Sequence, residues 1–120
     1  MIHETEYDAQ KAIFEWADIM SKKCPVLKYL NGSLNGVRLP IGAAMKARRS
    51  GMKKGMPDIS LPVPRNGYHG LFIELKRKAG GVVSKEQKEW LAFLTAQGYR
   101  AVVCNGKSDA IREILEYLRG

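Results

Sequence analysis

The chain has 120 residues and 45% of them are hydrophobic, which is enough for one compact domain over residues 1–120 and not comfortably for two. Its 20 Lys and Arg residues against 12 Asp and Glu give a formal net charge of +8, which favours a polyanionic partner such as nucleic acid. No apolar run approaches the ~18 residues of a membrane span, and the acidic start M-I-H-E-T-E-Y-D argues against a signal peptide, so we expect a cytoplasmic protein with no membrane contact.

The first half of the chain predicts two helices separated by a loop. Thr5 is a candidate N-cap for a helix that ends before Pro25, and its apolar positions recur at helical spacing: Ala9, Ile13, Trp16, Ala17 and Met20. Residues 31–42 are rich in Gly and Asn and predict a loop or an irregular strand. A short helix is expected over residues 43–49, with Gly51 as its stop, and the basic linker M-K-K-G follows.

The second half predicts three strands and two helices. Residues 58–63 and 70–77 flank an Asn-Gly turn signal, which favours an antiparallel hairpin. Ser84-x-x-Gln87 matches a capping box for a helix that ends near Gly98. Residues 99–104 predict a third strand, and the strand–helix–strand unit favours a right-handed crossover with a parallel pair. The expected fold is α/β, a small mixed β-sheet flanked by helices.

The last two helices carry the remaining expectations about packing. In the helix that follows Ser84 the apolar set is Trp90, Leu91, Phe93 and Leu94. Ser108 or Asp109 is expected to cap the final helix. One face of that helix is apolar and consists of Ile111, Ile114, Leu115 and Leu118.

Cysteine and histidine are not expected to hold a metal ion in this chain. Cys24 and Cys104 are far apart and no C-x-x-C pair exists, which argues against a zinc site or a redox motif and favours a reduced, intracellular protein. Cys104 lies in an apolar run and is expected to be buried. His69 falls in the hairpin turn without a partner pattern, so we expect it to be exposed.

The most informative pattern is a P-D dipeptide followed, a hairpin's length later, by E-x-K. It occurs here as Pro57-Asp58 and Glu74-Leu75-Lys76. Side chains alternate along a strand, so Glu74 and Lys76 share one face while Ile73 and Leu75 point into a core. Two carboxylates and an ammonium in one patch suit a hard divalent cation and a water to be activated beside it, and in a basic chain they suggest phosphodiester cleavage. Surface salt bridges are the alternative explanation for each acid.

This pattern is the signature of the PD-(D/E)xK nuclease superfamily, and nearly the full chain resembles the VRR-NUC family, the virus-type replication–repair nucleases, in particular its small stand-alone phage members. The resemblance implies a restriction-endonuclease-like core. It rests on motifs in the same order and spacing: Glu6-x-x-x-Gln10, the Asn/Gly-rich residues 31–36, A-x-R-x-G-x-x-x-G-x-P-D over residues 47–58, L-x-I-E-L-K over residues 71–76, and S-x-E-Q-K-x-W over residues 84–90.

The resemblance implies a DNA endonuclease that depends on Mg²⁺ or Mn²⁺. It leaves open whether one metal ion or two act. Asp58 and Glu74 would be the metal ligands, together with the backbone carbonyl of Leu75. Lys76 would orient or deprotonate the attacking water and stabilise charge on the scissile phosphate.

Two further residues are candidates for the same site. Glu6 would complete it from the first helix, through water or a second metal ion, although Glu4, Asp8 and Glu15 compete and first-turn acids also serve the helix dipole. Gln87 would bond the surroundings of the lysine or a phosphate, although its position in a capping box explains a glutamine without catalysis.

The densest basic stretch immediately precedes Asp58, and we expect it to hold phosphates on either side of the cut. With two residues after the second strand, the DNA-binding candidates are Lys46, Arg48, Arg49, Lys53, Lys54, Arg77 and Lys78. A solvated charge run is the alternative for any single member. Only Tyr29 and Tyr68 offer stacking platforms, which favours duplex or structured DNA over single strands.

Stand-alone members of the family look like Holliday-junction resolvases, so the resemblance implies a homodimer that cuts branched DNA, preferably four-way junctions, in the cytoplasm of a phage-infected bacterium. A two-fold dimer would present two active sites to a two-fold junction. Two alternatives remain open at this point: a nuclease for flaps, other branched DNA or duplex DNA, and a basic DNA-binding module whose acids only support the fold.

Overall fold

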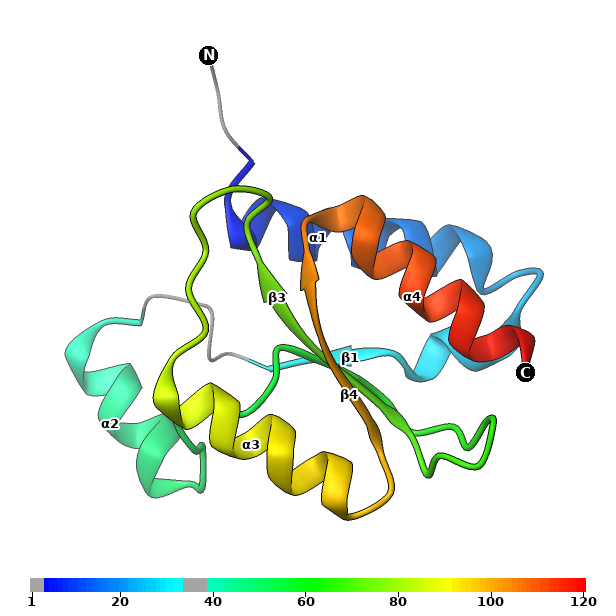
Figure 1. The fold of residues 1–120 in the computed structure, drawn as a ribbon. Helices are drawn as coiled ribbons and strands as arrows, with labels where there is room; N and C mark the ends of the chain where they lie inside the picture. The colour runs from blue at the N-terminus through cyan, green and yellow to red at the C-terminus, as the bar shows by residue number, and fades with distance from the viewer. Residues whose placement is uncertain (1–3, 34–38) are drawn as a thin grey trace.

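The structure is a computed structural model that describes residues 4–33 and 39–120. Four strands form one sheet in the order β1-β2-β3-β4, and Figure 1 shows helices packed on both of its faces. The α/β class and the small mixed sheet are therefore confirmed. The elements are α1 (Glu6–Met20), a 3₁₀ helix (Pro25–Tyr29), β1 (Asn31–Gly32), α2 (Ile41–Arg49), β2 (Ile59–Leu61), β3 (Leu71–Lys76), α3 (Lys85–Ala96), β4 (Arg100–Asn105) and α4 (Lys107–Arg119).

The sheet combines the predicted hairpin with the predicted parallel pair. β2 pairs antiparallel with β3, with Ile59 opposite Ile73, and β3 pairs parallel with β4, with Glu74 opposite Val103. β2 is shorter than the 58–63 that we expected, because Pro62 and Pro64 beyond its end carry no N–H to continue a ladder. β1 pairs antiparallel with β2; the rest of the Asn/Gly-rich stretch, residues 34–38, lies outside the described residues.

The main core lies on the face of the sheet covered by α1 and α4 (Figure 1). The odd-numbered residues of β3 supply its centre, and Ile73 and Leu75 are fully buried there as predicted. The opposite face is covered more thinly, because Leu94 is the one buried residue of α3. On this thinner face Glu74, at an even-numbered position of β3, meets Gln87 of α3.

Local signals placed the first and third helices correctly. Thr5 caps α1 through a capping box with Asp8, and Ser84 caps α3 through a capping box with Gln87. α2 begins two residues before the expected Ala43, with Pro40 at its N-cap. These caps satisfy backbone N–H groups that a helix leaves free at its first turn.

Other local expectations were wrong. Gly106 is the N-cap of α4, and the Asp109 carboxylate accepts the Asn105 N–H instead. The 3₁₀ helix that begins at Pro25 was not predicted. Phe93 and Leu115 are exposed rather than packed, because the turns of their helices that face the sheet present Leu94 and Ile114 instead.

Candidate active site

Asp58 lies where β2 stops and β3 continues beyond it. The Leu75 N–H points toward the side of β3 on which β2 pairs, but β2 does not extend that far, and the Asp58 carboxylate accepts this N–H at 2.7 Å. The Asp58 carbonyl accepts the Ser33 N–H, also at 2.7 Å. The side chain and the backbone carbonyl of Asp58 thus each accept a hydrogen bond from a backbone N–H, and the residue is buried.

The carbonyl of Leu75 leaves the strand on the side where Asp58 lies. In a β-strand the N–H and C=O of one residue point to the same side, and the Leu75 N–H is the group that Asp58 accepts. The Leu75 carbonyl, a metal ligand that the family resemblance implies, therefore points to the same side of β3 as the Asp58 carboxylate.

Glu74 is held from two directions on the thinner face of the sheet. Gln87 of α3 donates from Nε2 to Glu74 Oε2 across 3.1 Å, and Lys76 Nζ lies 3.6 Å from the same oxygen. Glu74 is 1% exposed and Lys76 is 6% exposed. The lysine is therefore not one of a solvated basic run, which was the competing explanation for it.

The surroundings of Glu74 raise its pKa. Burial, and then the neighbouring Asp58 carboxylate, raise the pKa of Glu74 to about 8, while Lys76 opposes the shift. Glu74 Oε1 is buried without a hydrogen-bond partner in the described part of the chain. An ionised, buried carboxylate oxygen with no donor is costly unless a cation takes it up.

The donor set at this point fits a hard divalent cation. Asp58 and Glu74 contribute carboxylate oxygens, and hard oxygen ligands are those that Mg²⁺ and Mn²⁺ prefer. Across residues 4–33 and 39–120, no three His, Cys, Asp or Glu side chains converge as metal ligands. The pair would need further oxygens from the backbone or from water, and a third acidic ligand is not brought to them here.

Glu6 and Gln10 lie on the first two turns of α1. The Gln10 side chain packs on Gly32 so closely that a Cβ there would come within 2.6 Å of Gln10 Nε2. Gly32 is opposite Ile59, the residue after Asp58. Glu6 is half-buried one turn from Gln10, and the competing Glu4 lies near Gly106, whose N–H donates to the Lys76 carbonyl.

The basic candidates are exposed and lie on both sides of the acidic pair. Between Asp18 and Asp58 the sequence contains no acid, so every charged side chain of α2 and of the linker after it is a cation. Lys54 forms an exposed ion pair with Glu86, at 3.6 Å, and Arg77 donates to the Gly80 carbonyl. The remaining exposed candidates are Lys46, Arg48, Arg49, Lys53 and Lys78.

One contact that positions the site was missed at the sequence level. Trp90 was assigned to the apolar face of its helix, but its Nε1 donates to the Lys54 carbonyl across 3.1 Å. Gly55 lies against the backbone of Glu86, where a Cβ would come within 2.7 Å. α3 therefore packs on the linker that leads to Asp58 and holds it in place. Two residues of the sequence could have indicated this contact: the Gly before P-D and the Trp after the capping box.

Other expectations about reactive residues were met. Cys104 is buried and Cys24 is half-buried, and both are free thiols. His69 is exposed in the hairpin turn. None of the helices in the described ranges is long and apolar enough to cross a bilayer.

The chain is similar to known nuclease domains over almost its whole length. The model of the VRR-NUC domain family matches residues 4–108. A solved structure described as a VRR_NUC domain protein superposes with a TM-score of 0.82 at 32% sequence identity, covering 99% of this chain and 92% of the other. No curated protein is detectably similar.

Proposed function

The chain belongs to the VRR-NUC family of nucleases, and from this premise we propose that it is a metal-dependent DNA endonuclease with its active centre at Asp58, Glu74 and Lys76. The observation that carries the proposal is the buried Glu74 carboxylate, with one oxygen unpartnered and the Asp58 carboxylate beside it. That arrangement is unfavourable in the apo protein and becomes favourable when a cation neutralises it.

A bound Mg²⁺ or Mn²⁺ would supply Lewis acidity and a water of lowered pKa. Asp58, Glu74 and the Leu75 carbonyl would hold it. The residues of the chain itself position these ligands and the phosphate. The Leu75 N–H fixes the Asp58 carboxylate, Gln87 fixes that of Glu74, and Lys76 keeps a cationic donor on the same face of β3 for the scissile phosphate.

Glu6 is proposed as an outer member of the site, acting through water or a second metal ion. Its support is indirect: the Gln10 face of α1 is packed against β1 next to the strand that Asp58 begins. Glu4 lies near Gly106, whose N–H donates to the Lys76 carbonyl, so the choice of Glu6 over Glu4 rests on the Glu6-x-x-x-Gln10 motif of the family.

The cationic surface is proposed to hold the DNA backbone on either side of the cut. α2 buries none of its residues, so its basic last turn is free of the core and can approach phosphates. The contacts of α3 with Lys54 and Gly55 fix the backbone of the linker that carries Lys53 and Lys54 and leads to Asp58. Phosphate contacts position DNA without reading its sequence.

The preferred substrate is the four-way junction, cut by a homodimer in the bacterial cytoplasm during phage growth. Two copies related by a two-fold axis would offer one site to each of two symmetric strands. Flaps, other branched DNA and plain duplex are the alternative substrates. A basic DNA-binding module without catalysis is the non-enzymatic alternative.

The test is cleavage of labelled four-way junctions, flaps and duplexes with Mg²⁺ or Mn²⁺ present. Wild-type protein is expected to cut junctions first, and Asp58→Ala and Lys76→Ala are expected to bind the same DNA without cutting it. Equal cutting of all substrates would contradict the junction preference. Intact substrates throughout would favour the binding module over the nuclease.

A further inference from the structure

The exposed face of α2 carries large apolar side chains where a surface helix usually carries polar ones. Ile41 is 82% exposed and Met45 is 48% exposed. The half-buried residues of the helix are two small ones, Ala44 and Ala47, and none of its residues is buried. A surface helix usually turns its large apolar residues toward the core, so α2 reverses the ordinary pattern and leaves Ile41 and Met45 open to a partner.

Two arginines share the face of α2 on which these apolar side chains lie. Ile41, Met45 and Arg48 have the i, i+4, i+7 spacing that aligns side chains along one side of a helix, and Arg49 lies one turn beyond Met45. The helical rise separates Ile41 from Arg49 by about 12 Å along the axis. A basic helix that lies on a membrane keeps its charged face apart from its apolar face, whereas α2 places both kinds of side chain on one face.

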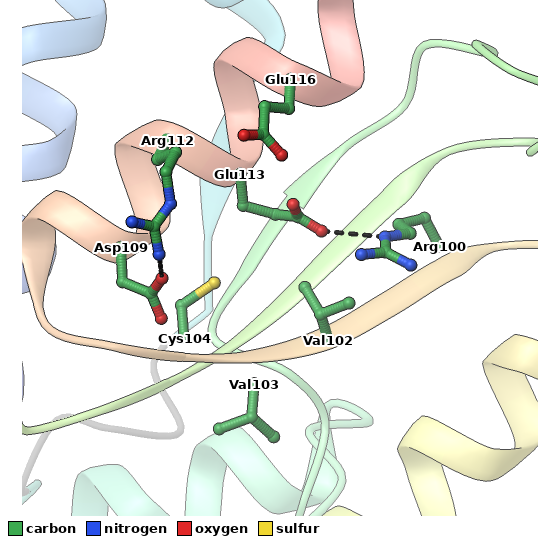
Figure 2. Close-up of a pocket in the computed structure, with 8 residues that line it drawn as sticks. All are labelled: Arg100, Val102, Val103, Cys104, Asp109, Arg112, Glu113 and Glu116. Carbon is green, nitrogen blue, oxygen red and sulfur yellow. Dashed lines mark hydrogen bonds and ion pairs between the residues drawn. The ribbon is translucent and has the colours of Figure 1, made fainter.

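The cations of α2 are not neutralised within the chain. In the part of the chain that the structure describes, no ion pair involves a charged side chain of α2. Beside the cavity that Figure 2 shows between β4 and α4, by contrast, Arg100 pairs with Glu113. Arg112 pairs there with Asp109. The charges of α2 are therefore open to an anionic partner, and phosphate groups are the anions that the substrate of a nuclease supplies.

A series of contacts connects the end of α2 to the proposed active centre. The chain folds back on the helix where the Met52 N–H donates to the Ala47 carbonyl at 3.0 Å. The linker that follows is fixed to the first turns of α3, and α3 holds Glu74 through Gln87. Figure 1 shows α2 at the side of the molecule where α3 begins. The helix is thus attached to the same elements that position the acidic pair.

We propose that Ile41 and Met45 form a wedge that inserts between the bases of the DNA substrate at a branch point, while Arg48 and Arg49 hold the phosphates beside it. Isoleucine and methionine are among the apolar side chains that proteins insert between base steps. Opening a base step costs least where bases are already unpaired, so the wedge favours branched DNA over continuous duplex. The wedge rests on the DNA substrate of the proposed function and supplies a physical reason for its preference. DNA fits better than another apolar surface because unpaired cations flank the wedge on its own face.

The first experiment measures binding in EDTA, so that it does not depend on cleavage. The DNA is a four-way junction with 2-aminopurine at the branch point, a base whose fluorescence rises when it loses its stacked neighbour. Wild type should increase this fluorescence. The double variant Ile41→Ala, Met45→Ala should bind the junction at least about 10-fold more weakly, because apolar burial is lost, and should leave the fluorescence near that of free DNA. Its circular dichroism spectrum and its affinity for a continuous duplex should equal those of wild type.

The control is Ile19→Ala, which shortens an apolar side chain that is 71% exposed on α1. It should bind junction and duplex like wild type. The wedge is refuted if the double variant matches wild type on the junction, if its affinity falls equally for junction and duplex, or if Ile19→Ala has the same effect. A wild type that leaves 2-aminopurine stacked, or that binds neither DNA, also refutes it. A protein that binds and unstacks the junction but cuts no DNA with Mn²⁺ contradicts the proposed function alone.

The same double variant distinguishes DNA from the other partners of an apolar surface. Without DNA, light scattering should give wild type and the double variant the same mass, and wild type should not bind vesicles of anionic phospholipid. A lower mass for the double variant would assign Ile41 and Met45 to a contact between copies of the chain. Vesicle binding by wild type and not by the double variant would assign them to a membrane surface. Either result would overturn the wedge.

Discussion

Gln87 binds Glu74 and caps its own helix at the same time. Its Nε2 donates to Glu74 Oε2 at 3.1 Å, while its Oε1 accepts the Ser84 N–H at 2.8 Å. The two amide atoms have different partners, so one side chain joins the start of α3 to the acidic centre on β3. The capping box and the hydrogen bond to Glu74 are therefore both present, and a role of Gln87 in cleavage stays a prediction.

The two roles of Gln87 can be separated by substitution. Gln87→Glu keeps the acceptor that caps α3 but loses the donor to Glu74 and adds a third negative charge there. We expect cleavage to fall roughly 10–100-fold, with a higher metal concentration needed for half-maximal rate. Ser84→Ala is the matched control: it should cost about 1 kcal/mol of stability and leave the rate and the metal dependence unchanged. A Gln87→Glu enzyme with wild-type metal dependence would leave the residue a structural role only.

Glu74 is predicted to make the metal-free protein less stable at high pH. Its pKa of about 8 in the folded state exceeds the 4.5 of an ordinary glutamate. Its contribution is therefore fully present below pH 4.5 and is lost as the pH rises through about 8. Glu74→Gln should remove this loss, on the order of 5 kcal/mol at high pH, and also abolish cleavage.

The measurement is the melting temperature in EDTA at pH 5 and pH 8.5. Wild type should lose several degrees more than Glu74→Gln between the two, and the exposed control Glu116→Gln should behave like wild type. Adding Mn²⁺ should raise the melting temperature of wild type and of Glu116→Gln, but not that of Glu74→Gln. If Glu74→Gln and wild type show the same pH dependence, the carboxylate is not strained by its surroundings.

Gly55 is expected to be essential to the linker that carries Asp58. It has φ +90°, and a Cβ there would meet the Glu86 backbone at 2.7 Å. Gly55→Ala should therefore add a clash to a backbone cost of about 1–3 kcal/mol. Gly51→Ala isolates the backbone cost, because Gly51 has φ +108° with open space around it. Urea denaturation should show the larger loss for Gly55→Ala, accompanied by a loss of cleavage; equal losses would exclude the close packing on α3.

The two thiols should differ in reactivity. Burial raises the pKa of the Cys104 thiol to about 12, so it stays protonated at pH 8, and the thiolate is the reactive form. Iodoacetamide should label the half-buried Cys24 at least about 100-fold faster than Cys104 in the native protein. In urea the two rates should converge. Rapid native labelling of Cys104 would mean that β4 and α4 do not pack as described.

The exposed arginines at the end of α2 should bind phosphate rather than bases. Arg48→Ala and Arg49→Ala should each weaken DNA binding by a similar factor for all sequences and reduce the slope of log K against log salt by about 1. Binding titrations at several salt concentrations measure this. Arg65→Ala, in the hairpin turn, is the control, and an equal effect there would argue against a localised DNA surface.

Several parts of the site could be predicted because they depend on short-range rules. Side-chain alternation alone puts Glu74 and Lys76 on one face and Leu75 in the core. The Asn-Gly turn and the Ser84–Gln87 capping box involve residues at most three positions apart. Each of these is a hydrogen-bond or steric preference of a few neighbouring residues, so the order of amino acids is sufficient to state it.

Other parts were decided by contacts between residues distant in the chain. The bond from Gln87 to Glu74, the clamp of Trp90 on the Lys54 carbonyl and the packing of Gln10 on Gly32 all join different elements. The N-cap of α4 was mispredicted for the same reason, since the backbone path out of β4 places Gly106 there. Which donor fills a buried acceptor, and which strand is left with an open edge, follows from how helices and sheet pack together, and no local pattern encodes that arrangement.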